Sequence, residues 1–188
     1  MSGKPGLDKD QAARLLHAIR FAAEQHRDDR RKGAISAPYI NHPITVAEQL
    51  AAVGLGDDTD LLISAVLHDV VEDTGATGEQ LERMFGPEVA AVVLEVSDDK
   101  SLEKNERKRL VVETIGQKSR TARLVKLSDL IANVYDVIHH PPPWTRERKL
   151  TYLTWADSCA KAMRGTHPEL ERKLVDLIED GRQRLGYE

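Results

Sequence analysis

The sequence predicts an all-α fold built as a single helical bundle. Apolar residues recur every three or four positions in successive segments, which is the spacing of one face of a helix. Sustained alternation of apolar and polar residues, typical of a half-buried strand, is missing. Proline, glycine and capping residues stand where helices are expected to begin and end. With 188 residues and 21.0 kDa, the chain is long enough to bury a full core as one domain over residues 1–188.

These boundary signals place each helix in turn. The first helix carries an apolar stripe that includes Leu16 and Ile19. The stretch 28–42 has no periodicity and is expected to be a loop, after which Pro43 suits the first helical position. Gly54 and Gly56 are expected to end the second helix, and Asp57 and Asp58 can cap the next one. Thr77 begins a capping pattern, and three prolines after residue 140 stop the helix 119–138. The expected helices cover residues 8–27, 43–53, 57–73, 77–85, 87–96, a charged segment after 101, and then 119–138, 145–164 and 168–185.

Composition and charge argue against several classes of partner. The chain has 27 Lys and Arg against 31 Asp and Glu, so its net charge of −4 is unlike that of a general binder of nucleic acid or anionic membranes. No segment approaches the ~18 consecutive apolar residues of a membrane span. Cys159 is the single cysteine, which leaves no disulfide framework and suits a reducing, cytoplasmic compartment. Residues 1–7 are expected to be a flexible end, and the oligomeric state stays open.

The first unusual cluster follows the most apolar run of the chain. His68-Asp69 and Glu72-Asp73 fall within an arc of roughly 140° on an ideal helix, so the four side chains can share one face. Four ionisable groups on a mostly buried helix are costly unless something compensates them. A divalent cation would do so, because it stabilises carboxylates and neutral imidazole together. The alternative is that the buried face ends at Leu67 and the acids reach solvent.

A second cluster lies in the apolar helix 119–138. Asp129 and Asn133 are one turn apart there, and Lys126 precedes Asp129 by three residues. Taken alone, Asp129 is more typical of a paired structural acid. Together with His42 and His68-Asp69, however, it completes a set of two imidazoles and two carboxylates, which suits a first-row divalent ion. The carboxylates favour Mn²⁺, with Fe²⁺, Co²⁺ and Zn²⁺ left open. The remaining histidines lack such neighbours and are expected at the surface or in packing: His17, His26, His139, His140 and His167.

The order of these residues resembles the H…HD…D pattern of the HD-domain metal-dependent phosphohydrolases. From about residue 22 to 156 the chain is similar to the hydrolase domain of the RelA/SpoT enzymes, and above all to stand-alone small alarmone hydrolases such as the metazoan SpoT homologues. It differs from that pattern at Leu130-Ile131-Ala132 and in the Gly33–Ser36 loop, both of which concern substrate fit. The similarity rests on Arg30-Arg31-Lys32, Pro38-Tyr39-Ile40-Asn41-His42-Pro43, Leu67-His68-Asp69-Val70-Val71-Glu72-Asp73-Thr74, Asp98-Asp99-Lys100 and Val125-Lys126-Leu127-Ser128-Asp129.

The resemblance implies an HD-domain helical bundle that hydrolyses ppGpp or pppGpp, with GDP or GTP and pyrophosphate as products. It implies that one metal, held by His42, His68, Asp69 and Asp129, lowers the pKa of its bound water. Glu72 and Asp73 would jointly orient or deprotonate that water and protonate the leaving oxygen. Without a catalytic role, these two residues would simply form an acidic helix end before Thr74. Acids at a helix C-terminus oppose the helix dipole, which favours the functional reading.

The resemblance also implies a set of contacts to a guanine nucleotide. An acidic protein needs local cations to collect a polyanionic substrate, and an arginine can stack on a base or grip phosphate. Without the resemblance, Arg30-Arg31-Lys32 is typical of a solvated charged run and Tyr152 of a core residue. The implied contacts are Arg31, Lys32, Asn133, Lys104, Arg148 and Tyr152.

Three other functions could use part of the same set of residues. An HD phosphohydrolase acting on deoxynucleotide 5′-phosphates or a cyclic dinucleotide needs the same four ligands but not the Arg31-Lys32 and Glu72-Asp73 context. A di-iron HD oxygenase would need additional histidines between His68 and Asp129, and the sequence has none there. A non-catalytic nucleotide sensor would typically lack a ligand or an acid, whereas all six are present. The hydrolase hypothesis is therefore preferred, and without a separate synthetase domain no synthetase activity is expected.

Overall fold

The computed structural model describes residues 9–33 and 36–186, and the part it describes is helical. No strand occurs in these residues; an isolated antiparallel bridge joins Arg30 to Pro38. The all-α prediction is thereby confirmed. The flexible end predicted at residues 1–7 lies outside the described residues. The elements are α1 (Lys9–Gln25), α2 (Asn41–Leu50), η1 (Ala51–Leu55), α3 (Thr59–Leu67), α4 (Val70–Asp73), α5 (Gly78–Phe85), α6 (Pro87–Val96), α7 (Lys104–Thr114), η2 (Ile115–Gln117), α8 (Arg120–His139), α9 (Arg146–Ala162) and α10 (Pro168–Arg184).

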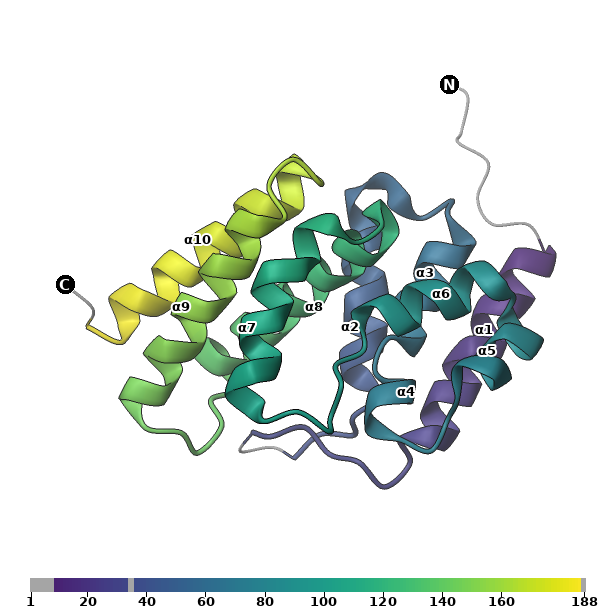
Figure 1. Cartoon of the computed structure of the whole chain (residues 1–188), viewed down its shortest axis with the longest axis horizontal. Helices are drawn as coiled ribbons and strands as arrows, with labels where there is room; N and C mark the ends of the chain where they lie inside the picture. Colours follow the sequence, from purple (N-terminus) through teal and green to yellow (C-terminus); the bar gives the residue numbers. More distant parts are fainter. Residues whose placement is uncertain (1–8, 34–35, 187–188) are drawn as a thin grey trace.

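The helices form two groups on either side of α2. Figure 1 shows α1, α3, α5 and α6 on the right, and α7, α8, α9 and α10 on the left. Helix α2 packs against both α3 and α8, so it joins the groups. Every residue of helix α3 except Asp60 is buried, and α8 buries about half of its residues. The side chains that α2, α3 and α8 direct toward one another therefore lie in the centre of the molecule.

Several helix ends follow the predicted capping chemistry. The Asp58 carboxylate accepts a hydrogen bond from the Leu61 N–H at 3.0 Å and caps α3. The Thr77 hydroxyl oxygen accepts one from the Gln80 N–H at 3.2 Å and caps α5. Gly54 takes a φ of +86°, a conformation that suits glycine, where the α2–η1 segment ends. These local signals fix the lengths of the helices that carry the central side chains.

Three details differ from the sequence prediction. Helix α2 begins at Asn41, so Pro43 lies inside its first turn, where no helical partner for a proline N–H is needed. Leu16, placed on the buried stripe of α1, is 65% exposed because the core covers a narrower face of that helix. The predicted helix 57–73 is broken: α3 ends at Leu67 and α4 begins at Val70. His68 and Asp69 thus occupy the turn between two helices and not a continuous helical face.

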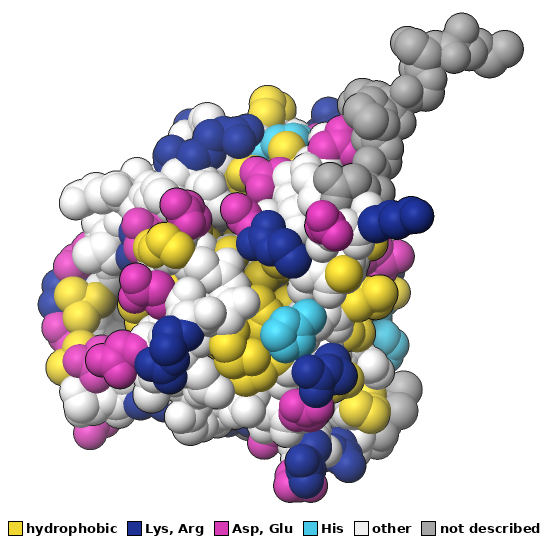
Figure 2. Space-filling model, turned by 90° about the vertical axis from the view of Figure 1, so that its right-hand side faces the viewer, with side chains coloured by type: hydrophobic (Ala, Val, Ile, Leu, Met, Phe, Trp, Pro, Cys, Tyr) yellow, Lys and Arg dark blue, Asp and Glu magenta, His cyan; other side chains and the backbone are white. Residues whose placement is uncertain are grey.

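The surface mixes charges of both signs. On the face shown in Figure 2, Lys and Arg side chains are interspersed with Asp and Glu around small apolar areas. None of the described helices has the length and apolar character needed to cross a lipid bilayer.

Candidate metal and acid–base site

Four side chains from three separate segments converge in the centre of the molecule. His42 comes from the first turn of α2, His68 and Asp69 from the α3–α4 turn, and Asp129 from the middle of α8. The Nε2 atom of His42 lies 3.1 Å from Asp129 Oδ1 and 3.7 Å from Asp69 Oδ2. The Nε2 atom of His68 lies 2.9 Å from Asp69 Oδ2 and 3.7 Å from Asp129 Oδ1. Both imidazoles therefore face both carboxylates.

The two histidine rings present unpartnered nitrogen atoms to this centre. Nε2 of His42 and Nε2 of His68 are buried and have no hydrogen-bond partner of acceptable geometry. The opposite nitrogen of His68, Nδ1, lies 2.8 Å from the Ala65 carbonyl oxygen, to which it donates. This bond fixes the ring so that Nε2 points at the carboxylates, as in many metal-binding histidines. The ligand atoms of His42, His68 and Asp69 lie within 4.8 Å of one another, close enough to share one ion.

Burial and mutual charge set the protonation of the cluster. Burial lowers the pKa of His42, and the neighbouring Asp129 carboxylate offsets this only in part. Burial also opposes the charged form of His68, but the Asp69 and Asp129 carboxylates outweigh it and raise its pKa to about 10. Asp129 keeps a pKa well below its usual range despite burial, because Lys126 donates to its Oδ2 at 3.0 Å. The cluster thus contains one neutral imidazole, one imidazolium and two carboxylates.

The two acids of α4 lie beside this cluster but in different surroundings. Burial, together with the charges of nearby acids, raises the pKa of Glu72 to about 7, although the Asp98 N–H donates to its Oε2 at 3.0 Å. The Asp73 carboxylate instead receives the Lys100 ammonium at 2.5 Å. One acid can therefore exchange a proton near neutral pH, while the other is held by a lysine.

A cavity of about 520 Å³ opens beside the acids. Glu72 and Asp73 line it together with four of the six predicted substrate contacts: Arg31, Lys32, Asn133 and Tyr152. Lys104 and Arg148 are not among its lining residues, although the Arg148 guanidinium lies 4.4 Å from the ring centroid of Trp144, which is one. The structure thus brings four predicted contacts to the acids and leaves two nearby.

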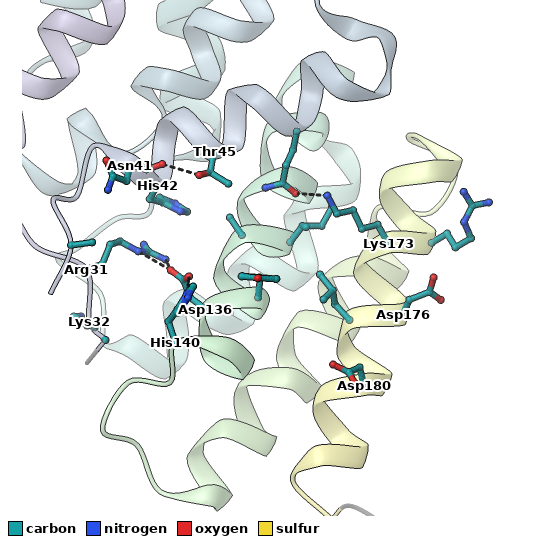
Figure 3. Close-up of a pocket in the computed structure, with 18 of the residues that line it drawn as sticks. Arg31, Lys32, Asn41, His42, Thr45, Asp136, His140, Lys173, Asp176 and Asp180 are labelled. Atoms are coloured by element: carbon teal, nitrogen blue, oxygen red, sulfur yellow. Dashed lines mark hydrogen bonds and ion pairs between the residues drawn. The ribbon is translucent and has the colours of Figure 1, made fainter. Parts of the chain in front are cut away.

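A larger cavity of about 920 Å³ lies between α2, α8 and α10. It is lined by His42 but by neither Glu72 nor Asp73, whereas both acids and none of the four cluster residues line the smaller cavity. Tyr39 lines the smaller cavity and donates a hydrogen bond to Asp69, which places the cluster next to it. Arg31, Lys32 and Asp136 line both cavities, and Figure 3 shows the ion pair between Arg31 and Asp136. Arg31 donates to Asp136 Oδ2 from Nε at 3.1 Å and from Nη2 at 2.7 Å, and Nη2 also donates to Asn133 Oδ1 at 2.7 Å.

Sequence reasoning missed some side chains of this region. Asp136 lies seven residues after Asp129, on the same face of α8, so helical periodicity could have found it. Lys100 and Tyr39 stand inside two of the motifs that carry the family resemblance, but nothing in those motifs assigned a role to either residue. Their loops meet the site only through the fold, and no periodic signal places them.

Comparison with known proteins agrees with this geometry. The sequence profile of the HD domain matches residues 18–138. The chain belongs to the HD-domain family. It is 43% identical over 168 residues to guanosine-3′,5′-bis(diphosphate) 3′-pyrophosphohydrolase MESH1 of Drosophila melanogaster, covering 89% of this chain and 94% of that protein. It is 44% identical over 170 residues to the Homo sapiens protein of the same name, covering 90% and 95%.

A solved structure resembles this HD-domain chain over its whole length. It is described as a metazoan ortholog of SpoT that hydrolyzes ppGpp and plays a role in starvation responses. The two share a TM-score of 0.87 and 39% sequence identity, with 100% of each chain covered. The expected family and helical architecture are confirmed together.

Proposed function

We propose that this chain is a metal-dependent hydrolase that converts guanosine 3′,5′-bis(diphosphate) to GDP and pyrophosphate. The observation that carries the proposal is the convergence of His42, His68, Asp69 and Asp129 beside a cavity that contains Glu72. The choice of substrate is supported by the names of relatives that are 43–45% identical to this chain over about nine-tenths of its length.

The residues fit a divalent cation. Two buried imidazole nitrogens without hydrogen-bond partners face two carboxylates, a donor set that suits first-row metals. We propose His42, His68, Asp69 and Asp129 as the ligands and Mn²⁺ as the ion, since half of the donor groups are carboxylates. Such an ion makes water a better nucleophile at neutral pH and stabilises charge on a phosphoryl group.

The protein's own acids would manage the protons. Release of intact pyrophosphate requires water to form a bond to the phosphorus on the ribose 3′ oxygen, while the bond from that phosphorus to the 3′ oxygen breaks. The water loses a proton and the 3′ oxygen gains one. Glu72 suits both transfers because its pKa of about 7 lies close to the working pH. Asp73, held by Lys100, would orient the water.

The cations around the smaller cavity would bind the nucleotide. Lys32, Lys104 and Arg148 form no ion pair with any carboxylate of the described residues, so their charges are available to phosphates. Burial and the nearby cations of Arg148 and Lys32 lower the pKa of Lys104, which reflects how closely these charges approach. We propose that Asn133 and Tyr152 complete the pocket with base or ribose contacts. We also propose the cytoplasm as the compartment, since the one cysteine is buried and free.

The decisive experiment is to incubate the purified chain and Mn²⁺ with ppGpp and to separate the products. GDP with pyrophosphate supports the proposal, whereas orthophosphate or no turnover contradicts it. Parallel reactions with deoxynucleotide 5′-phosphates and a cyclic dinucleotide test the other HD-domain chemistries. Binding of ppGpp without turnover would indicate a nucleotide sensor.

Two variants test the residue assignments. Asp69→Ala removes a proposed ligand and should abolish both Mn²⁺ retention and turnover. The exposed Glu79, in the first turn of α5, provides the matched control, and Glu79→Gln should leave metal content and turnover unchanged.

A further inference from the structure

Tyr39 lies at the junction of the ligand cluster and the acid pair. Its backbone is fixed on both sides: its N–H donates to the Asp29 carbonyl at 3.1 Å, and its carbonyl accepts from the His42 N–H at 2.9 Å. Its hydroxyl donates to Asp69 Oδ2 at 2.6 Å and lies 3.4 Å from Asp73 Oδ2. One side chain therefore reaches both a proposed ligand and a proposed acid.

The oxygen of Asp69 that accepts this bond is the one that faces the histidines. Asp69 Oδ2 is 2.9 Å from His68 Nε2 and 3.7 Å from His42 Nε2. Asp69 stands before the short helix α4 but makes no side-chain cap bond there. Among the described residues outside the proposed ligands, Tyr39 is the group that hydrogen-bonds to this carboxylate. The orientation of the carboxylate thus depends on a phenol hydroxyl.

The tyrosine ring is itself held in place. It packs on the His26 ring at 4.7 Å between centroids and meets the His42 ring edge-on at 5.8 Å. A phenol held by these two ring contacts is well suited to orient a carboxylate.

We propose that Tyr39 is a positioning residue that fixes the Asp69 carboxylate for metal binding and couples it to Asp73. This inference rests on the proposed function, because it assumes that Asp69 is a metal ligand. Outer partners of metal ligands typically contribute about 10–100-fold to metal affinity. Loss of the hydroxyl should therefore weaken Mn²⁺ binding by about tenfold without removing the site.

The test is Tyr39→Phe, which keeps the ring and removes the hydroxyl. Isothermal titration of the metal-free protein with Mn²⁺, in the absence of nucleotide, should give a dissociation constant about tenfold weaker than that of the wild type. Turnover at limiting Mn²⁺ should fall similarly and return to within about threefold of wild type when Mn²⁺ saturates the variant. Tyr135→Phe, at a tyrosine that is 46% exposed and lines only the larger cavity, is the matched control and should change neither quantity.

The possible results for Tyr39→Phe separate failure of the positioning role from failure of the proposed function. A wild-type Mn²⁺ affinity in Tyr39→Phe overturns the positioning role, and so does lost turnover that saturating Mn²⁺ does not restore. Urea unfolding in the presence of a chelator reports the fold of the variant. An unfolded Tyr39→Phe would also contradict the assignment, since the hydroxyl would then serve the fold. If the wild type itself neither binds Mn²⁺ nor hydrolyses ppGpp, the proposed function fails instead.

Discussion

Metal binding should release about one proton, and that proton should come from His68. In the metal-free protein the carboxylates of Asp69 and Asp129 raise the pKa of His68 to about 10, so its ring is an imidazolium at neutral pH. Because Nδ1 donates to the Ala65 carbonyl, the second proton resides on Nε2, the atom that faces the cluster. A cation can bind this nitrogen only after the proton leaves.

The number of protons follows from the other members of the cluster. His42 contributes none, because burial lowers its pKa and keeps its ring neutral. Asp69 and Asp129 are already ionised, since His68 holds the pKa of Asp69 down and Lys126 that of Asp129. Release of one proton makes the apparent dissociation constant for Mn²⁺ fall about tenfold per pH unit between about pH 7 and 9.

The same shift affects the stability of the metal-free protein. The pKa of His68 is raised above its unfolded value of about 6.5. The resulting stabilisation is therefore fully present below about pH 6.5 and is lost as the pH rises through about 10. The metal-free protein should accordingly become easier to unfold across the range in which its metal affinity increases.

Titration calorimetry in buffers of different ionisation enthalpy measures the proton count. At about pH 7.5 the slope of observed enthalpy against buffer enthalpy should correspond to about one proton per Mn²⁺. Measurement in Glu72→Gln removes any contribution from the Glu72 carboxyl, and His17→Gln, on α1, should leave the count unchanged. A slope below about 0.3 proton with one bound Mn²⁺ would refute the reasoning, because His68 would then be neutral before the metal arrives.

Three further outcomes are expected. Glu72→Gln should retain Mn²⁺ but lower kcat by about 10²–10⁴-fold. It should also remove the ionisation near pH 7 from the pH profile of kcat/KM. A fully active variant would contradict the role of Glu72. Asp136→Asn weakens the two hydrogen bonds that hold Arg31. The KM for ppGpp should therefore rise about tenfold, while kcat stays within about threefold of the wild-type value. An unchanged KM would contradict a role of Asp136 in positioning Arg31. Gly116→Ala should cost about 1–3 kcal/mol in urea unfolding, because a Cβ there would lie 2.6 Å from the Ala162 carbonyl oxygen; a stability equal to that of the wild type would show that η2 and α9 can move apart.

The helices and their ends could be predicted because local rules govern them. The caps at Asp58 and Thr77 and the glycine at position 54 act through groups only a few residues away. The core of α8 also followed from periodicity. The break after Leu67 did not, because the apolar run shows no glycine or proline there. In the folded chain the His68 ring bonds back to Ala65, and tertiary surroundings complete the turn.

The site could be predicted only in part for a related reason. Two imidazoles and two carboxylates suggested a metal, yet only the order of motifs, which resembles a known family, indicated that they meet. The roles of Tyr39 and Lys100 were beyond sequence reasoning, because each reaches the site from a loop with no periodic pattern. Asp136 is different: it belongs to a polar stripe on α8 that includes Asp129 and Asn133, and that stripe was available in the sequence.

This arrangement of charge explains how an acidic protein would accommodate a polyanion. The carboxylates of Asp69, Asp73 and Asp129 are each paired with a histidine or a lysine, Asp69 and Asp129 in the interior and Asp73 at the surface. Three cations without a carboxylate partner in the described part of the chain, by contrast, lie close to one another: Lys32, which lines the smaller cavity, Lys104 and Arg148. Burial, followed by the charges of Arg148 and Lys32, lowers the pKa of Lys104. A bound divalent cation would add two positive charges beside the acids and displace one proton from His68, so the site would gain one net positive charge. Phosphates would then meet local positive charge even though the chain carries a net charge of −4. Attraction of the substrate should therefore be local, and added salt should weaken binding less than it would for a protein with a broad basic surface.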